Sequence, residues 1–243
     1  MKILITNDDG IFAPGIIPLV EWAKKIGEVT VVAPKNEQSG KSHAIEFVNP
    51  VEIKKLDIFP GVEAYSMDST PADCVRFGIM GLKKNYDLVL SGINRGVNLG
   101  VDMIYSGTVA AIFEASYWKH KALAFSTYPD ARDEAAMELD TVYNYIKENN
   151  LFEYNDIFNV NIPKNPVGIK ITKQGSPYFD DGFKHIEGNM YIQTGEMVPD
   201  EFPDDLTRDT VAIKNGFISI TPLTLNRTNL DAFDKLSKNK PLV

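Results

Sequence analysis

Short runs of apolar residues that end in turn-forming residues alternate with amphipathic segments over much of the chain. The runs at 3–5, 29–33 and 87–90 have the length and composition of buried strands. Between the first two, apolar residues recur at helical spacing, with Gly27 after them where a helix commonly ends: Leu19, Trp22, Ala23 and Ile26. Continuous apolar strands on either side of an amphipathic helix are typical of a parallel βαβ unit. We therefore expect an α/β fold with a mostly parallel sheet flanked by helices.

Local signals predict further elements of the same kind. Thr70 can cap a helix that starts at the following proline, and Ser106 can cap a helix that starts after it. Apolar runs at 123–125 and 158–162 predict two more strands, and an amphipathic pattern at 139–146 predicts a helix between them. We expect Cys74, on the first of these helices, to be a small buried residue and not a nucleophile.

The pattern changes after Gly168, where short apolar segments alternate with connections rich in glycine, proline and aspartate. These segments predict strands, and a final amphipathic pattern predicts a helix at 229–238: the strands are at 169–172, 190–194, 211–214 and 217–221. We expect one domain over 1–243, with its core at about 1–165 and a β-hairpin extension plus a terminal helix at about 168–243. Projecting hairpins often serve subunit contacts.

Two adjacent carboxylates, Asp8 and Asp9, follow the first strand. Like charges so close together raise each other's pKa unless a positive charge lies between them. A hard divalent cation would remove that penalty, because such ions prefer oxygen ligands. The alternative is that both residues only form a turn and cap the next helix.

Further oxygen donors follow the next strands of the expected parallel sheet. Ser39 lies in the polar loop after the second strand, and Asn94 follows the strand at 87–90. Parallel topology brings all these strand ends to one edge of the sheet, where open α/β sheets bind ligands. For Ser39 the alternative is a plain polar surface loop.

An anion site is predicted beside these donors. Ser106 and Thr108 offer hydroxyl groups at a helix start, and the free N–H groups of that helix face the same way. The segment could also be a well-capped helix without a ligand, and the two interpretations are compatible. The nearby glycines do not form G-x-G-x-x-G, so a dinucleotide-binding fingerprint is not supported.

Composition narrows the range of partners. The formal net charge of -8 lacks the basic excess of a general nucleic-acid binder, so we expect no duplex partner. The single cysteine cannot form an intramolecular disulfide, which fits a reducing compartment. No apolar run approaches the length of a membrane span. We expect a cytoplasmic protein with no membrane partner.

A set of ordered motifs resembles the SurE survival-protein family of metal-dependent 5'-nucleotidases. The motifs run nearly the whole length of the chain: NDDG at 7–10, APGI at 13–16, VVAP at 31–34, SG at 39–40, TPADCV at 70–75, SGIN at 91–94, GVNLG at 96–100, YSGTVAA at 105–111 and SITPL at 219–223. Departures from the family pattern are modest, with Ser69 and Ala115 at positions where glycine is common. Neither position belongs to the expected metal ligands.

The resemblance implies a Rossmann-like core, one Mg²⁺ or Mn²⁺ per subunit and hydrolysis of nucleoside 5'-monophosphates. It also implies activity on 3'-nucleotides and polyphosphate, and a homodimer or homotetramer. The metal ligands implied by position are Asp8, Asp9, Ser39 and Asn94. In the mechanism that follows, Asp8 and Asp9 hold the metal and one of them takes a proton from water.

Other residues receive roles in the same hypothesis. Ser106, Gly107 and Thr108, together with Asn98, would stabilise the phosphate oxygens. Asn7 would orient the loop or a ligand from outside the coordination sphere. Among the remaining polar residues, His43 has some claim to the site because it is close to Ser39, and Arg95 could steer an anionic substrate, although each could equally be a surface residue.

Three rival classes are weighed against this hypothesis. An aspartyl phosphatase would need Asp-x-Asp after the first strand, and Gly10 stands in the last of those positions. A receiver domain would need an aspartate acceptor where this chain has the segment 91–94, which contains none. A non-catalytic metal-dependent nucleotide sensor remains as the alternative, and it would bind nucleotide without releasing phosphate.

Overall fold

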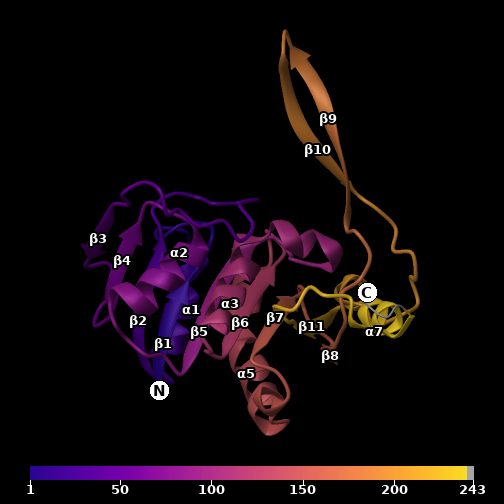
Figure 1. Ribbon diagram of the computed structural model, residues 1–243. Coiled ribbons are helices and arrows are strands. Elements are labelled where there is room, and N and C mark those ends of the chain that lie inside the picture. Colours follow the sequence, from indigo (N-terminus) through magenta and orange to yellow (C-terminus); the bar gives the residue numbers. More distant parts are fainter. Residues whose placement is uncertain (240–243) are drawn as a thin grey trace.

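One nine-stranded sheet runs through the protein, seen in the computed structural model of Figure 1. The structure describes residues 1–239, so 240–243 of the predicted C-terminal extension lie outside the described residues. In spatial order the strands are β3 (Ile53–Leu56), β4 (Glu63–Met67), β2 (Glu28–Pro34), β1 (Lys2–Thr6), β5 (Leu88–Arg95), β6 (Ala122–Thr127), β7 (Ile157–Ile162), β11 (Phe217–Pro222) and β8 (Gly168–Ile171). Neighbours from β4 to β7 pair in parallel, and β3 and β11 join that block antiparallel. The expected mostly parallel α/β sheet is confirmed.

Helices cover both faces of this sheet. One face packs against α1 (Ile16–Ala23), α4 (Arg132–Met137) and α5 (Leu139–Glu148). The other packs against α2 (Pro71–Arg76), the π-helical segment Phe77–Gly81 and α3 (Gly107–Tyr117). Two short 3₁₀ helices are at Gly100–Tyr105 and Leu151–Glu153.

Double-sided burial explains why the strands are continuously apolar. Side chains alternate between faces along a strand, so Ile3 and Ile5 enter one core while Leu4 enters the other. All three are fully buried. Burial of one such side chain stabilises the fold by roughly 1.5–3 kcal/mol, so a polar residue at any of them would be strongly destabilising.

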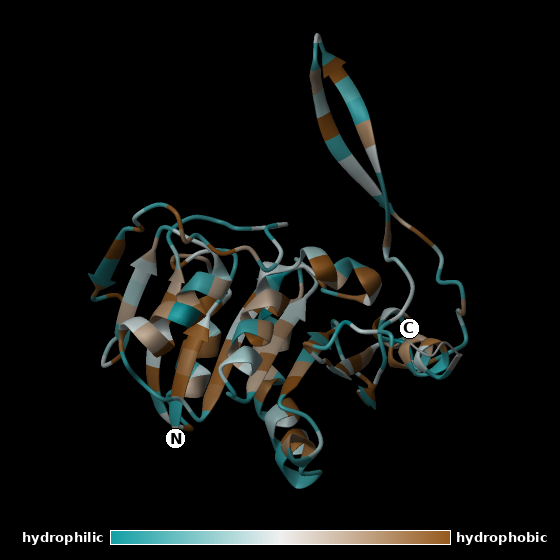
Figure 2. Ribbon diagram, in the orientation of Figure 1, coloured by the Kyte–Doolittle hydropathy of each residue, from teal (hydrophilic) through white to brown (hydrophobic). Residues whose placement is uncertain are grey.

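A long hairpin projects from the body of the protein (Figure 1). It consists of β9 (Phe179–Glu187) and β10 (Met190–Met197), which pair antiparallel. Brown and teal bands alternate along its strands in Figure 2, and apolar side chains such as Phe183, which is 76% exposed, face solvent. The predicted hairpin extension is confirmed, as is a terminal helix, α7 (Leu230–Asn239). No helix among residues 1–239 is both long and apolar enough to cross a membrane.

The predicted strand at 211–214 is wrong, because these residues belong to helix α6 (Asp209–Lys214). A buried Asp209 fixes the helix start by accepting hydrogen bonds from the N–H groups of Gly100, Gly175 and Thr210 at 2.7–3.0 Å. The apolar residues of this run are buried. A short buried helix and a short buried strand are both apolar throughout, so composition alone does not distinguish them.

Two predicted boundaries also differ. The first helix ends at Ala23, four residues before Gly27. Gly27 is required by close packing, since a Cβ atom there would lie 2.4 Å from the carbonyl oxygen of Met1. The strand predicted at 87–90 continues to Arg95, so Asn94 lies within the paired part of the strand, one residue before its end.

Candidate active site

The turn after β1 is closed by Asn7. This fully buried side chain donates from Nδ2 to the carbonyl oxygen of Gly10 at 2.8 Å and accepts the N–H of Gly10 at 3.2 Å. Gly10 has a φ of +103°, a conformation that favours glycine. Asn7 thus fixes the backbone that presents the two aspartates, from a position beneath the turn.

Asp8 is only 4% exposed and is held by the first turn of α3. Thr108 donates its hydroxyl to Oδ1 of Asp8 at 2.6 Å and its N–H to Oδ2 at 3.1 Å. Burial raises the pKa of Asp8 to about 6, and the neighbouring Asp9 adds to the rise while Thr108 opposes it. Each carboxylate oxygen keeps a further lone pair, so Asp8 is a constrained donor that a cation would stabilise in its charged form.

Gly107 lets the helix approach Asp8 closely. A Cβ atom at this position would lie 2.9 Å from Cβ of Asp8 and 3.1 Å from Cγ of Pro71. A larger residue would therefore push the helix start away from the carboxylate. Both donors of Thr108 are used by Asp8, so contact of Thr108 with a phosphate stays a prediction, whereas its contact with Asp8 is observed.

Asp9 is half-buried and borders a different cavity from Asp8. Its Oδ2 accepts the backbone N–H of Arg95 at 3.1 Å. Burial raises the pKa of Asp9, and the negative charge of Glu37 adds to this while the hydrogen bond and charge of Arg95 oppose it. Both aspartates are therefore penalised in their charged forms, which is the condition under which a bound cation gains most.

The predicted donors lie around two adjoining cavities. A cavity of about 240 Å³ is lined by Asp8, Ser39, Asn94, Asn98 and Ser106, and by Arg95. The cavity beside it, of about 540 Å³, is lined by Asp9 and again by Asn94 and Arg95. Asp8 and Asp9 thus border different cavities, and Asn94 lies between them.

The chemistry of the donor set suits a hard cation. Asn94 donates from Nδ2 to the carbonyl oxygen of Gly96 at 2.8 Å, which leaves its amide oxygen as a ligand. Ser39 donates its hydroxyl to Glu37 at 2.6 Å, which leaves its lone pairs as a ligand. Within residues 1–239, no three or more His, Cys, Asp or Glu side chains cluster as metal ligands. The set consists of two carboxylates and two neutral oxygens, which are the ligands that hard divalent cations prefer.

Asn98 is fixed by buried polar side chains of the neighbouring strands. Asn161 accepts the N–H of Asn98 at 2.8 Å and donates to its carbonyl oxygen at 2.9 Å, and Asn159 donates to the same oxygen at 2.8 Å. Ser126 accepts from the Asn98 side chain at 2.8 Å. Neither Asn159 nor Asn161 is among the predicted site residues, although two asparagines at alternate positions of an apolar strand indicate buried polar groups that need hydrogen-bond partners.

Ser106 borders the cavity as the cap of α3. Its Oγ accepts the N–H of Val109 at 3.1 Å, so its hydroxyl proton remains available to a ligand. Arg95 lines both cavities. His43 does not line either of them, because its ring is bonded to Glu114 and faces a separate cavity. Cys74 is buried on α2, and burial raises its thiol pKa well above the ordinary value, which makes it a poor nucleophile.

Comparison with known proteins identifies the family. The family described as "Survival protein SurE" matches residues 3–181. A protein named 5'-nucleotidase SurE from Thermosipho africanus is 37% identical over 98% of this chain and 97% of its own, and one from Petrotoga mobilis is 38% identical over 97% and 98%. The SurE crystal structure from Aquifex aeolicus superposes with a TM-score of 0.81 at 33% identity, covering 98% of this chain and 99% of that one. This chain belongs to the survival protein SurE family.

Proposed function

We propose that Asp8, Asp9, Ser39 and Asn94 hold one divalent cation, Mg²⁺ or Mn²⁺, and that the chain hydrolyses nucleoside 5'-monophosphates to nucleoside and phosphate. The main support is that these oxygen donors come from three neighbouring strand ends and line adjoining cavities. The relatives named 5'-nucleotidase SurE, similar over nearly their whole length, support the reaction class. A bound divalent cation would supply positive charge to the phosphate and lower the pKa of a coordinated water.

The chain's own groups bind and orient the phosphate in this proposal. Ser106 offers a hydroxyl proton and Asn98 offers the second hydrogen of its amide, both toward the cavity that Asp8 lines. The guanidinium of Arg95 adds positive charge beside them. Either aspartate can take the proton of the attacking water, and Asp9 has the more exposed carboxylate of the two. Thr108 and Asn7 act through the aspartate turn.

Two aromatic side chains suit the nucleoside half of the substrate. Tyr105 and Phe179 line the cavity of Asp8 and are 54% and 41% exposed. Asp102 holds the base of the hairpin in place by accepting the N–H groups of Tyr178 and Phe179 at 2.8 and 3.0 Å. Stacking of a base on an aromatic side chain contributes about 1–3 kcal/mol, so these rings favour a nucleotide over a bare phosphate.

The assembly and the compartment belong to the same proposal. We propose a homodimer or homotetramer, supported by the exposed apolar side chains of the hairpin and of α7, such as Phe183 and Phe233. A cytoplasmic location is supported by the single buried cysteine. We also propose that 3'-nucleotides and polyphosphate are further substrates, because the site recognises the phosphate mainly through its oxygens.

Phosphate release from a panel of nucleoside 5'- and 3'-monophosphates and polyphosphate, with Mg²⁺, Mn²⁺ or EDTA, tests the proposal. We expect metal-dependent release from the 5'-monophosphates and its loss in Asp8→Asn. Full turnover by that variant would contradict the ligand assignment. Nucleotide binding without release under any metal would favour the alternative, a metal-dependent nucleotide sensor.

A further inference from the structure

The loop that carries Ser39 has no regular structure of its own. Residues 35–52, between β2 and β3, form neither helix nor strand, and most of their side chains are at least partly exposed. Such a loop has no ladder of hydrogen bonds to fix its position. A cation needs its ligands within a few tenths of an ångström of the correct distance, so other contacts must hold Ser39 in place.

The backbone of this loop is tied to two parts of the site. The N–H of Gln38 donates to the carbonyl oxygen of Asp8 at 2.7 Å, just before Ser39. Beyond Ser39, the N–H and hydroxyl of Ser42 donate to the carbonyl oxygens of Tyr105 and Ile104 at 3.0 and 2.6 Å. The loop is therefore held on the aspartate turn before Ser39 and on the segment leading into α3 after it.

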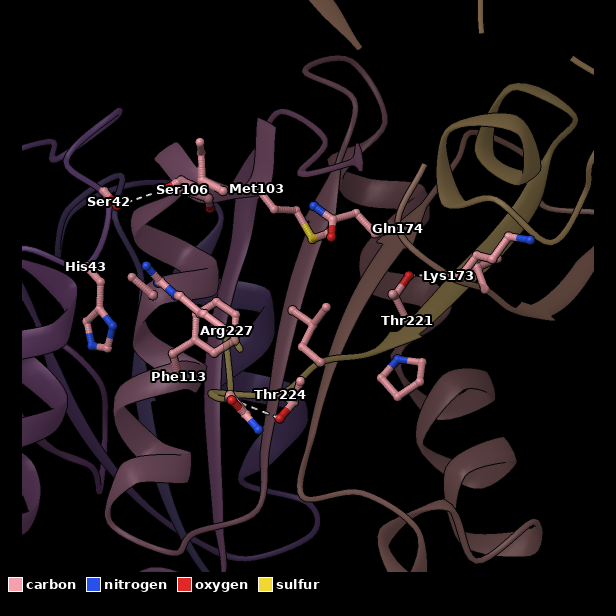
Figure 3. A pocket seen from close by; sticks show the side chains of 16 residues that line it. Ser42, His43, Met103, Ser106, Phe113, Lys173, Gln174, Thr221, Thr224 and Arg227 are labelled. Atoms are coloured by element: carbon pink, nitrogen blue, oxygen red, sulfur yellow. Dashed lines mark hydrogen bonds between the residues drawn. The ribbon is translucent and has the colours of Figure 1, made fainter. Parts of the chain in front are cut away.

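The next residue, His43, contacts α3 itself. Its Nε2 is 2.8 Å from Oε2 of Glu114, and its ring stacks on Phe113 with centroids 6.4 Å apart. Ser42, His43, Phe113 and Ser106 line one cavity of about 450 Å³, where they are drawn together (Figure 3). His43 is thus bonded to α3 about two helical turns after Thr108, which holds Asp8.

Glu114 is a fixed partner for this contact. It is 4% exposed, and its Oε1 also accepts from Arg76 at 3.0 Å and from Trp118 at 2.8 Å. Burial by itself would raise the pKa of Glu114, but the hydrogen bonds of His43 and Trp118 and the charge of Arg76 outweigh it and lower the pKa. The carboxylate is therefore charged and rigidly oriented, and it offers one oxygen to His43.

The same helix holds Asp8 at its first turn and His43 through Glu114 near its end. Helix α3 therefore holds Asp8 directly and holds the loop of Ser39 through His43. One rigid helix thus sets the relative position of these two proposed metal ligands. His43 lines neither cavity of the metal ligands, so its effect on the site would pass through the loop.

We propose that His43 is a positioning residue for the metal site: its bond to Glu114 anchors the Ser39 loop on α3, so that affinity for the divalent cation depends on it. This inference rests on the proposed function. Substitutions of residues that orient metal ligands typically weaken metal binding about 10–100-fold. Gln38 and Ser42 keep their own contacts, and beyond His43 the carbonyl oxygen of Ala44 and the N–H of Glu46 stay bonded to Thr70 and Asp73. We therefore expect the low end of that range, about tenfold.

A matched pair of amide variants tests the role of this bond. Glutamine places its amide nitrogen about where Nε2 of histidine lies, whereas asparagine is one methylene shorter and does not reach Glu114. Calorimetric titration with MnCl₂, without nucleotide, should give a Kd for His43→Asn about tenfold above wild type and a Kd for His43→Gln within about threefold of it. At saturating Mn²⁺ both variants should keep a near-wild-type KM for nucleotide.

Control and contrary outcomes are distinct. His185→Ala changes an exposed hairpin histidine whose ring contacts Tyr191 and the carbonyl oxygen of Gly188, so it should leave the Mn²⁺ Kd unchanged. Equal Kd values for His43→Asn and His43→Gln, whether at or above wild type, would overturn the anchoring role alone. Absence of Mn²⁺ binding by wild type would overturn the metal site itself and this inference with it.

Discussion

The buried carboxylate of Asp8 should make the metal-free protein less stable than a variant that cannot bind metal. The unfolded chain ionises Asp8 near the ordinary value of 3.8, whereas burial raises its pKa in the folded protein to about 6. At neutral pH the metal-free protein therefore holds a poorly solvated negative charge. Asp8→Asn replaces that charge with a neutral amide of the same shape. We expect this variant to be inactive and yet to unfold at a higher temperature than wild type in EDTA.

The magnitude follows from the pKa and the contacts of Thr108. A rise from 3.8 to about 6 corresponds to about 3 kcal/mol of lost stability for the charged form. The amide oxygen can still accept from the Thr108 hydroxyl, but its NH₂ would face the N–H of Thr108, and the loss of that bond costs about 1 kcal/mol. The net gain is about 2 kcal/mol, which raises the Tm of a chain of this size by roughly 4–8 °C.

The pH dependence has a definite sign. The raised pKa of Asp8 does not affect the free energy of unfolding below about pH 3.8. The free energy of unfolding falls as the pH rises from 3.8 to about 6, and above that it stays lower by a constant amount. At about pH 4.5 the penalty is about 1 kcal/mol, which the lost hydrogen bond cancels. Wild type and Asp8→Asn should then melt together at pH 4.5 and separate at pH 7.5.

Thermal unfolding followed by circular dichroism measures this effect, at both pH values and with EDTA or MnCl₂. Mn²⁺ should raise the Tm of wild type at pH 7.5 and leave that of Asp8→Asn unchanged. Asp9→Asn is the matched control, and its Tm should rise less, because Asp9 is only half-buried. A Tm for Asp8→Asn equal to or below that of wild type in EDTA at pH 7.5 would refute the reasoning.

Three further changes probe other parts of the site. Thr108→Val removes the hydroxyl bond to Asp8 and should raise the Asp8 pKa further, so its Mn²⁺ affinity should fall more at pH 6 than at pH 8 in calorimetry. Asn161→Ala leaves the Asn98 N–H without its partner and should lower the free energy of unfolding in urea by about 1–3 kcal/mol; an unchanged midpoint would contradict this. Tyr105→Ala should raise the KM for nucleoside monophosphates about 5–150-fold while leaving that for ribose 5-phosphate, which has no base, nearly unchanged, and equal effects on both would argue against base stacking.

Features set by neighbouring residues could be predicted from the sequence. Thr70 and Ser106 cap helices as expected, because a cap depends only on a side chain and the N–H groups that follow it. The carboxyl ends of the strands also gather at one edge as parallel topology requires, so Asp8, Ser39 and Asn94 line one cavity.

Features set by distant contacts could not. Gly27 is needed because Met1 lies against it, and the helix at Asp209–Lys214 depends on hydrogen bonds from residues more than thirty positions away along the chain. The hydrogen bond from Thr108 to Asp8 joins two segments 100 residues apart. The sequence links His43 to the site only through its closeness to Ser39, whereas its bonding partner, Glu114, is 71 residues away.

The strand order around the site limits how its metal preference can change. Asp8 and Asp9 follow β1, and Asn94 lies near the end of β5, the neighbour of β1 in the sheet. Adjacent strands lie about 4.8 Å apart because their backbone hydrogen bonds require it, so the spacing between these ligands is inherited from the sheet, whereas Ser39 is placed by its loop. A different ion would be accommodated by exchanging one donor for another, such as an amide for an imidazole, on an unchanged frame.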